Sequence, residues 1–182
     1  MFKYLLSPKK FLPITFNETV HTIDFNALKK AGKKALLIDL DNTLIPYDQD
    51  LPNDILIEFF KSLKQAGFNI CIVSNNKEKR IKPFAESVNL DYVYSAKKPL
   101  TKGLKKGMQK LASSKQETLM IGDQIMTDVL AAKRLGIDVV LVKPIKRKSE
   151  KWYTKVNRFL ENRVLKAIKK TDITLYETIT KE

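Results

Sequence analysis

The stretch from Ala35 to Thr43, ALLIDLDNT, is an apolar run that ends at two carboxylates. The run ALLID at 35–39 is short and holds no Gly or Pro, which favours a strand buried on both faces. Asp39 and Asp41 follow two positions apart, where the apolar run ends. Taken alone, the pair fits a turn that begins with Asp and Asn. The residues that follow the other predicted strands distinguish a simple turn at Asp39 and Asp41 from a functional site.

Short apolar runs alternate with amphipathic stretches from Ala35 onward. The pattern predicts strands at 35–39, 68–73, 92–94, 118–121 and 139–142, and helices at 53–66, 78–88, 100–112 and 126–135. In the first helix, apolar residues recur at helical spacing: Ile55, Phe59, Leu63 and Ala66. We expect an α/β fold, with a Rossmann-like parallel five-stranded sheet and helices on both faces. Ligands of such sheets bind beyond the carboxyl ends of the strands.

Polar side chains follow each of the next three predicted strands. Ser74-Asn75-Asn76 follows the second, Lys97-Lys98-Pro99 the third, and Gly122-Asp123 the fourth, with Asp128 five residues beyond Asp123. Hydroxyl, ammonium and carboxylate groups are what phosphoryl transfer requires. Each has a simpler explanation by itself, because Ser74 can cap a helix, Asp128 can support one, and the lysines can be solvated. The lone histidine, His21, lies outside the alternating region, which excludes a histidine-based mechanism.

Four segments, DLDNT, VSN, KKP and GDQIMTD, occur in an order that resembles the four motifs of the haloacid dehalogenase superfamily of phosphohydrolases. Within it, the chain is similar to the small subfamily IIIA members, above all to the YqeG-type bacterial proteins and the related phosphatidylglycerophosphate phosphatases. The likeness extends to FLP near the amino terminus, to LKKAGKKAL and to the closing LVKPI. It therefore covers nearly the whole chain.

The resemblance implies a covalent mechanism in two steps. Asp39 attacks phosphorus and becomes an aspartyl-phosphate, while Asp41 protonates the leaving oxygen and then activates water. Lys98 neutralises charge on the phosphoryl group and on Asp39. Lys97 is the alternative for this role, but the following Pro99 and the order of the motifs favour Lys98.

The same resemblance implies the binding groups. A divalent cation, expected to be Mg²⁺, would be held by Asp39, the main-chain carbonyl of Asp41, Asp123 and Asp128. Phosphate-binding groups would come from Thr43, Ser74, Asn75 and Lys98, with Thr43 also orienting the first loop.

The spacing of the motifs leaves no room for a cap domain over the site. Asp41 and Ser74 are 33 positions apart, and Ser74 and Lys98 are 24 apart, enough for one helix and its connections in each interval. An uncapped site cannot enclose a small metabolite. We therefore expect a phosphomonoester presented on something large, such as a membrane, a nucleic acid end or a protein.

Charge is distributed unevenly along the 182 residues. The formal net charge is +14: residues 1–34 carry +5, residues 35–142 only +2, residues 143–170 +9 and residues 171–182 −2. We expect a basic lead-in at 1–34, a catalytic core at 35–145 and a basic amphipathic helix with its tail at 146–182, packed on or beside the core.

The expected carboxyl-terminal helix has an apolar face opposite a basic one. The apolar face contains Trp152, Tyr153, Val156, Phe159, Leu160, Val164 and Ile168. It either packs on the domain or lies in the head-group layer, where the basic face would attract anionic lipid. An anionic membrane surface is thus one expected partner, and nucleic acid is a less favoured one.

Other features bear on the compartment. Cys71 is the only cysteine and has no disulfide partner, which fits a reducing environment. No apolar run is long enough for a transmembrane segment, and Pro8 and Pro13 interrupt the apolar start before it could form a signal peptide. We expect a cytoplasmic protein, with peripheral association on the inner face of the membrane left open.

The sequence therefore predicts a magnesium-dependent phosphomonoester hydrolase. Its substrate would be large or membrane-presented, and the resemblance suggests a lipid such as phosphatidylglycerophosphate. Two alternatives stay open: a phosphatase of nucleic acid ends or proteins, and a non-catalytic RNA- or ribosome-binding module on the same fold.

Overall fold

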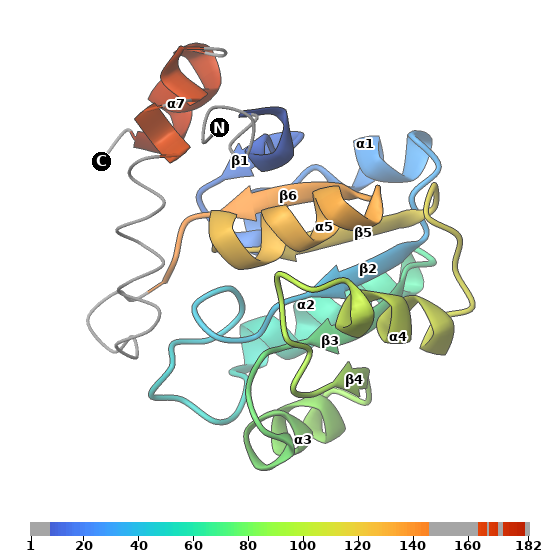
Figure 1. The fold of residues 1–182 in the computed structure, drawn as a ribbon. Coiled ribbons are helices and arrows are strands. Elements are labelled where there is room, and N and C mark those ends of the chain that lie inside the picture. The colour runs from blue at the N-terminus through green and yellow to red at the C-terminus, as the bar shows by residue number, and fades with distance from the viewer. Residues whose placement is uncertain (1–7, 146–163, 167, 171–172, 181–182) are drawn as a thin grey trace.

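The centre of the molecule is a six-stranded, fully parallel sheet in the order β1-β6-β5-β2-β3-β4 (Figure 1). The computed structural model describes residues 8–145, 164–166, 168–170 and 173–180. The strands are β1 (Thr15–Asn17), β2 (Ala35–Ile38), β3 (Asn69–Val73), β4 (Asp91–Val93), β5 (Thr118–Gly122) and β6 (Asp138–Val142). The α/β class with a parallel sheet is confirmed.

The expectation of five strands was wrong by one, because β1 adds an edge strand. It pairs with β6 in the register Thr15↔Val140. Its three residues, TFN, are exposed or half-buried and include a single apolar side chain, so no apolar run marks them. The expected basic lead-in at 1–34 therefore contributes to the sheet.

Helices cover both faces of the sheet (Figure 1). One face carries α1 (Phe25–Lys30), α2 (Asp54–Gln65) and α3 (Glu78–Ser87), while the other carries α4 (Lys102–Lys110) and α5 (Leu130–Leu135). Two single-turn 3₁₀ helices, Pro8–Phe11 and Val20–Thr22, flank β1. Alternate strand residues supply the two cores: Leu36 and Ile38 face α2, whereas Leu37 faces α4 and α5.

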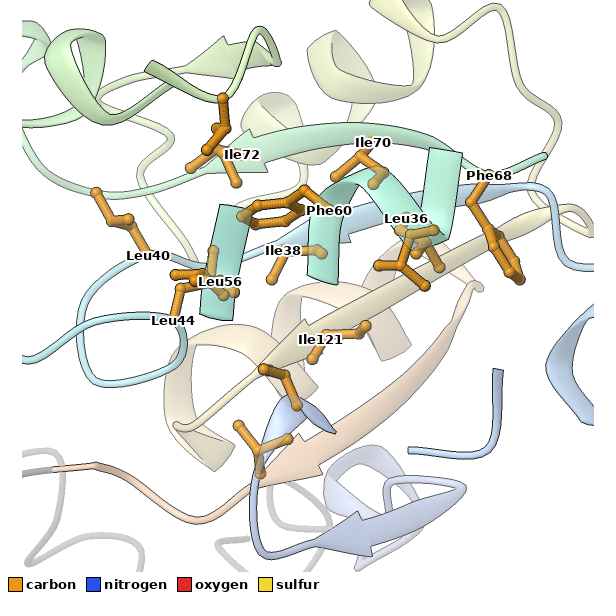
Figure 2. Packing of buried hydrophobic residues seen from close by; sticks show 14 of the residues in the cluster. Leu36, Ile38, Leu40, Leu44, Leu56, Phe60, Phe68, Ile70, Ile72 and Ile121 are labelled. Carbon is orange, nitrogen blue, oxygen red and sulfur yellow. The ribbon is translucent and has the colours of Figure 1, made fainter. Parts of the chain in front are cut away.

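Helix α2 shows how one core layer is built. The Asn53 side chain accepts a hydrogen bond from the Leu56 amide and caps the helix. Leu56, Phe60 and Leu63 are buried, and Figure 2 shows Leu56 and Phe60 packed over β2 and β3. Each such side chain contributes about 1.5–3 kcal/mol through burial. The predicted stripe was partly wrong, since Ile55 is 69% exposed.

The helix expected at 126–135 has two parts. It begins as a π-helical turn, Ile125–Val129, continues as α5, and ends at Gly136, whose φ of 78° is left-handed. A π turn inside a helix is uncommon and occurs often at functional sites. This turn carries Asp128, so it determines where the Asp128 side chain lies relative to the end of β5.

The described part of the carboxyl-terminal region packs on the α4/α5 side of the sheet. Val164 and Ile168 are buried in that core, and α7 (Ile173–Thr180) contributes partly buried Tyr176 and Ile179. Most of the expected amphipathic helix, including Trp152 and the rest of 146–163, lies outside the described residues. Among the helices in the described ranges, none has the length and apolar character needed to cross a membrane.

Candidate active site

The carboxyl ends of three adjacent strands bring the predicted polar residues together. In the register of the sheet, Ile38 of β2 lies beside Ile72 of β3 and Ile121 of β5. The order of connections reverses between β2 and β5, which is the topological switch point where such sheets bind ligands. Asp39, directly after β2, lies at this point.

Three buried carboxylates form a cluster there. One oxygen each of Asp39, Asp123 and Asp128 lie within 4.8 Å of one another. The Thr43 hydroxyl donates a hydrogen bond of 3.2 Å to Asp123 Oδ1, so in this structure Thr43 orients a carboxylate of the cluster. The Gln124 amide donates to Asp128 Oδ2 over 3.1 Å. Asp123 and Asp128 are thus each held by a hydrogen bond from a neighbouring residue.

Gly122 makes room for this cluster. A Cβ atom at this position would lie 2.5 Å from Asp128 Oδ2, closer than any real contact allows. The glycine before Asp123 is therefore needed for the approach of Asp128 to the strand end.

Lys98 is the ammonium group of the site. Its Nζ lies 2.6 Å from Asp39 Oδ1, 2.6 Å from Asp128 Oδ1 and 2.8 Å from the Val73 carbonyl oxygen. The contacts with Asp39 and Val73 are hydrogen bonds, and the contact with Asp128 is an ion pair. Lys97 is exposed and has a left-handed φ of 55°. Of the two candidate lysines, Lys98 is the one that reaches the acids.

Burial and the neighbouring opposite charge have opposite effects on the pKa values of Asp39 and Lys98. Burial raises the pKa of Asp39 well above its usual value; Lys98 counteracts this, while the nearby carboxylates of Asp128, Asp123 and Asp41 add to the rise. Burial by itself would lower the pKa of Lys98, but Asp128 and Asp39 outweigh it, so the pKa of Lys98 is raised. The lysine stays charged in a dry site.

The segment after β3 supports Lys98 through its backbone. The Asn75 side chain donates to the Lys98 carbonyl (3.0 Å) and accepts from the Lys98 amide (2.7 Å). Ser74 is buried, and its hydroxyl oxygen accepts a hydrogen bond from the Asn76 amide. The Asn75 side chain therefore positions the lysine loop, a role that the sequence did not predict.

Asp41 lies outside the acidic cluster and has partners of its own. Asn76 Nδ2 donates to Asp41 Oδ2 over 2.6 Å, and Arg80 donates to Asp41 Oδ1 from Nε (3.0 Å) and Nη2 (2.8 Å). Sequence reasoning missed both partners. The available signal was their position, because Asn76 directly follows VSN and Arg80 lies in the first turn of the next predicted helix.

The cluster suits a hard divalent cation. Its donors are carboxylate oxygens that are close together, buried and only partly neutralised by Lys98. Such oxygen ligands are the type that Mg²⁺ prefers. Asp39, Asp123 and Asp128 are the residues available to hold such an ion.

Comparison with solved structures agrees on the fold. A hypothetical protein from Xanthomonas campestris superposes with a TM-score of 0.51 at 15% identity, covering 68% of this chain and 71% of its own. An uncharacterized protein from Listeria monocytogenes serotype 4b gives a TM-score of 0.50 at 20% identity, covering 59% of this chain and 77% of its own. At these identities the likeness concerns the fold alone.

Sequence comparison is more specific. The "Probable phosphatase YqeG" of Bacillus subtilis (strain 168) is 37% identical over 89% of this chain and 94% of its own length. The "Phosphatidylglycerophosphate phosphatase 1, chloroplastic/mitochondrial" of Arabidopsis thaliana is 26% identical over 93% of this chain, which spans only 53% of the plant protein. The sequence model of the haloacid dehalogenase-like hydrolase family matches residues 21–136, the stretch that holds all four strand-end motifs. The chain therefore belongs to the haloacid dehalogenase-like hydrolase family.

Proposed function

We propose that this chain is a Mg²⁺-dependent phosphatase that cleaves phosphomonoesters through an aspartyl-phosphate on Asp39. The observation that carries the proposal is the pairing of Asp39 with Lys98 beside two further carboxylates. A structural ion pair has no need of the additional acids, which repel Asp39 electrostatically. A site for a cation and a phosphoryl group accounts for all four groups.

In the first step, an Asp39 carboxylate oxygen forms a bond to phosphorus as the bond from phosphorus to the leaving oxygen breaks. Asp41 donates a proton to that leaving oxygen. Lys98 and the Ser74 hydroxyl stabilise negative charge on the phosphoryl oxygens, with the main-chain N–H of Asn75 assisting.

In the second step, water attacks phosphorus and gives a proton to Asp41. The acyl-phosphate bond breaks, inorganic phosphate leaves and the Asp39 carboxylate is restored. Asp39, the Asp41 carbonyl oxygen, Asp123 and Asp128 would hold Mg²⁺. Bound there, the cation reduces the repulsion between the carboxylate and the phosphate.

We further propose a phosphorylated lipid, such as phosphatidylglycerophosphate, as the substrate class. The name of the Arabidopsis relative, a phosphatidylglycerophosphate phosphatase, supports this choice. The connections at the edge of the site support it too. The β2–β3 and β3–β4 connections hold one helix each, α2 and α3, so neither contains a cap domain that could enclose a small substrate. Five of the seven large apolar residues that are exposed in the described ranges lie on connections leaving this edge: Leu51, Ile55, Tyr94, Leu100 and Ile145. Exposed apolar groups on these connections suit a substrate embedded in a lipid surface, at which the protein would associate peripherally.

The high positive charge favours a second candidate, a phosphatase of nucleic acid ends. One experiment separates the two. Purified protein with Mg²⁺ is assayed on a phosphorylated lipid in mixed micelles, a 5′-phosphorylated oligonucleotide and p-nitrophenyl phosphate. We expect the lipid to give the highest kcat/KM. Faster hydrolysis of the oligonucleotide would favour the second candidate, and no hydrolysis of any substrate would reject the phosphatase proposal.

A further inference from the structure

We propose that Arg80 is a positioning residue for this reaction. It orients Asp41 and links it to later residues of the same connection between β2 and α2. The inference rests on the proposed role of Asp41 as acid and base. It assigns a function to a side chain that lies outside the motifs of the nucleophile, the lysine and the acidic cluster.

Arg80 contacts four groups on one connection. Besides Asp41 Oδ1, its Nη1 donates to Asp50 Oδ1 over 2.7 Å and its Nη2 to the Pro46 carbonyl oxygen over 3.3 Å. The guanidinium also lies over the Tyr47 ring, 5.6 Å from its centroid. A single side chain from α3 thus binds the connection at residues 41, 46, 47 and 50.

Exposure distinguishes the two ion pairs of Arg80. The Asp50 side chain is 84% exposed, so water screens that pair and its contribution to stability is small. The Arg80 and Asp41 side chains are 12% and 13% exposed, so their pair is largely removed from water. The contact of Arg80 with Asp41 therefore constrains the position of the two side chains more than its contact with Asp50 does.

The contacts fix the Asp41 carboxylate at both oxygens. Arg80 holds Oδ1 with two N–H groups, and Asn76 holds Oδ2. A lysine is a point donor and cannot present the planar fork that meets Asp41, Asp50 and the Pro46 carbonyl together. Because a misplacement of about 1 Å can cost on the order of 10²-fold in rate, a carboxylate that moves protons gains from such a clamp.

The test compares two substrates that need the proton to different degrees. Phenyl phosphate releases a more basic oxygen than p-nitrophenyl phosphate and so depends more on protonation by Asp41. We expect Arg80→Gln to lower kcat/KM, which reports the step that releases the phenol, by about 10²-fold on phenyl phosphate and by less on p-nitrophenyl phosphate. Guanidinium ion at millimolar concentration should restore part of the activity of Arg80→Ala.

Lys79→Gln is the matched control, because it removes the same charge from the neighbouring, exposed position of α3. It should retain the activity of the unmodified protein on both substrates. If Arg80→Gln does not fold, Arg80→Lys keeps the charge and carries the same expectation.

The outcomes separate this inference from the proposed function. An unmodified protein that hydrolyses neither aryl phosphate nor the lipid overturns the phosphatase proposal, and the inference with it. An active protein whose folded Arg80 variants keep their kcat/KM on phenyl phosphate overturns the inference alone. Equal losses of kcat/KM on both substrates without guanidinium rescue would also overturn it, since they indicate a purely structural role.

Discussion

At the scale of single residues, the candidate site combines groups that would be unfavourable elsewhere in a core. Burial and three neighbouring carboxylates oppose the ionised form of Asp39, and Lys98 compensates only in part. Buried like charges cost stability and are retained where binding or catalysis needs them, so they mark candidate functional sites. We therefore expect some substitutions that abolish metal binding to leave the fold as stable as before.

Asp123→Asn tests this expectation. The amide is nearly isosteric, can still accept from Thr43 and removes one negative charge from the cluster. We expect the metal-free variant to have a Tm at least equal to that of the unmodified protein, but to lose the rise in Tm that Mg²⁺ produces. Calorimetry with and without Mg²⁺ measures both. A variant that Mg²⁺ still stabilises fully would show that Asp123 is not a ligand.

Gly122→Ala tests the space beside Asp128. Its Cβ would meet the Asp128 carboxylate, so that side chain must move away from Lys98. We expect a loss of stability of about 1–3 kcal/mol together with a fall in kcat of at least about tenfold.

Gly136→Ala is the control for that variant. It introduces strain at a left-handed φ of 78° with no atom within 4 Å of the new Cβ. It should cost about 1–2 kcal/mol of stability and leave kcat unchanged. Normal kcat in Gly122→Ala would contradict the need for Asp128 at this position.

At the scale of elements, α4 supports the loop that presents Lys98. A Cβ on Gly103 would lie 2.6 Å from the Ala96 carbonyl oxygen, so the helix packs directly on the backbone two residues before Lys98. A Cβ on Gly107 would instead meet the end of the Leu37 side chain at 2.8 Å, and that flexible end can shift. The two glycines of one helix thus differ in what they approach.

The pair Gly103→Ala and Gly107→Ala separates packing from helix propensity. Each gains about 1 kcal/mol of helix propensity. We expect Gly107→Ala to be nearly neutral in urea unfolding and Gly103→Ala to be destabilising, with loss of phosphatase activity through displacement of Lys98. Equal stability and activity of the two variants would contradict the close packing of α4 on this loop.

Some elements could be predicted from the sequence, and others could not. The strand ends were predictable because continuous apolar runs such as those before Asp39 and Asp123 stop abruptly at polar residues. Strand β1 was not, because three mixed residues carry no periodic signal, and the π turn before α5 has the same apolar spacing as an ordinary helix. Arg80 was missed for another reason: its partner, Asp41, is 39 residues away, and only the fold brings the two together.

At the scale of the whole molecule, the helices on both faces shield the centre of the sheet from solvent. Cys71, in the middle of β3, is fully buried, and burial raises the pKa of its thiol to about 12. Only the thiolate reacts readily, so this cysteine should be inert in the folded protein.

Because Cys71 is the only cysteine, it reports on global unfolding. We expect iodoacetamide to label the protein only as guanidinium chloride unfolds it, with a midpoint that matches circular dichroism. Rapid labelling of the native protein would indicate that β3 opens locally and would contradict a sheet that is closed around it.

The central claim, that Asp39 is a nucleophile, is tested most directly by trapping the phosphorylated enzyme. Asp41→Asn should slow hydrolysis of the intermediate, so acid-quenched turnover of a reactive aryl phosphate should leave phosphate on the protein. Peptide mass spectrometry should locate it at Asp39, and Asp39→Asn should carry none. Turnover without any protein-bound phosphate, or phosphate bound at another residue, would contradict the account.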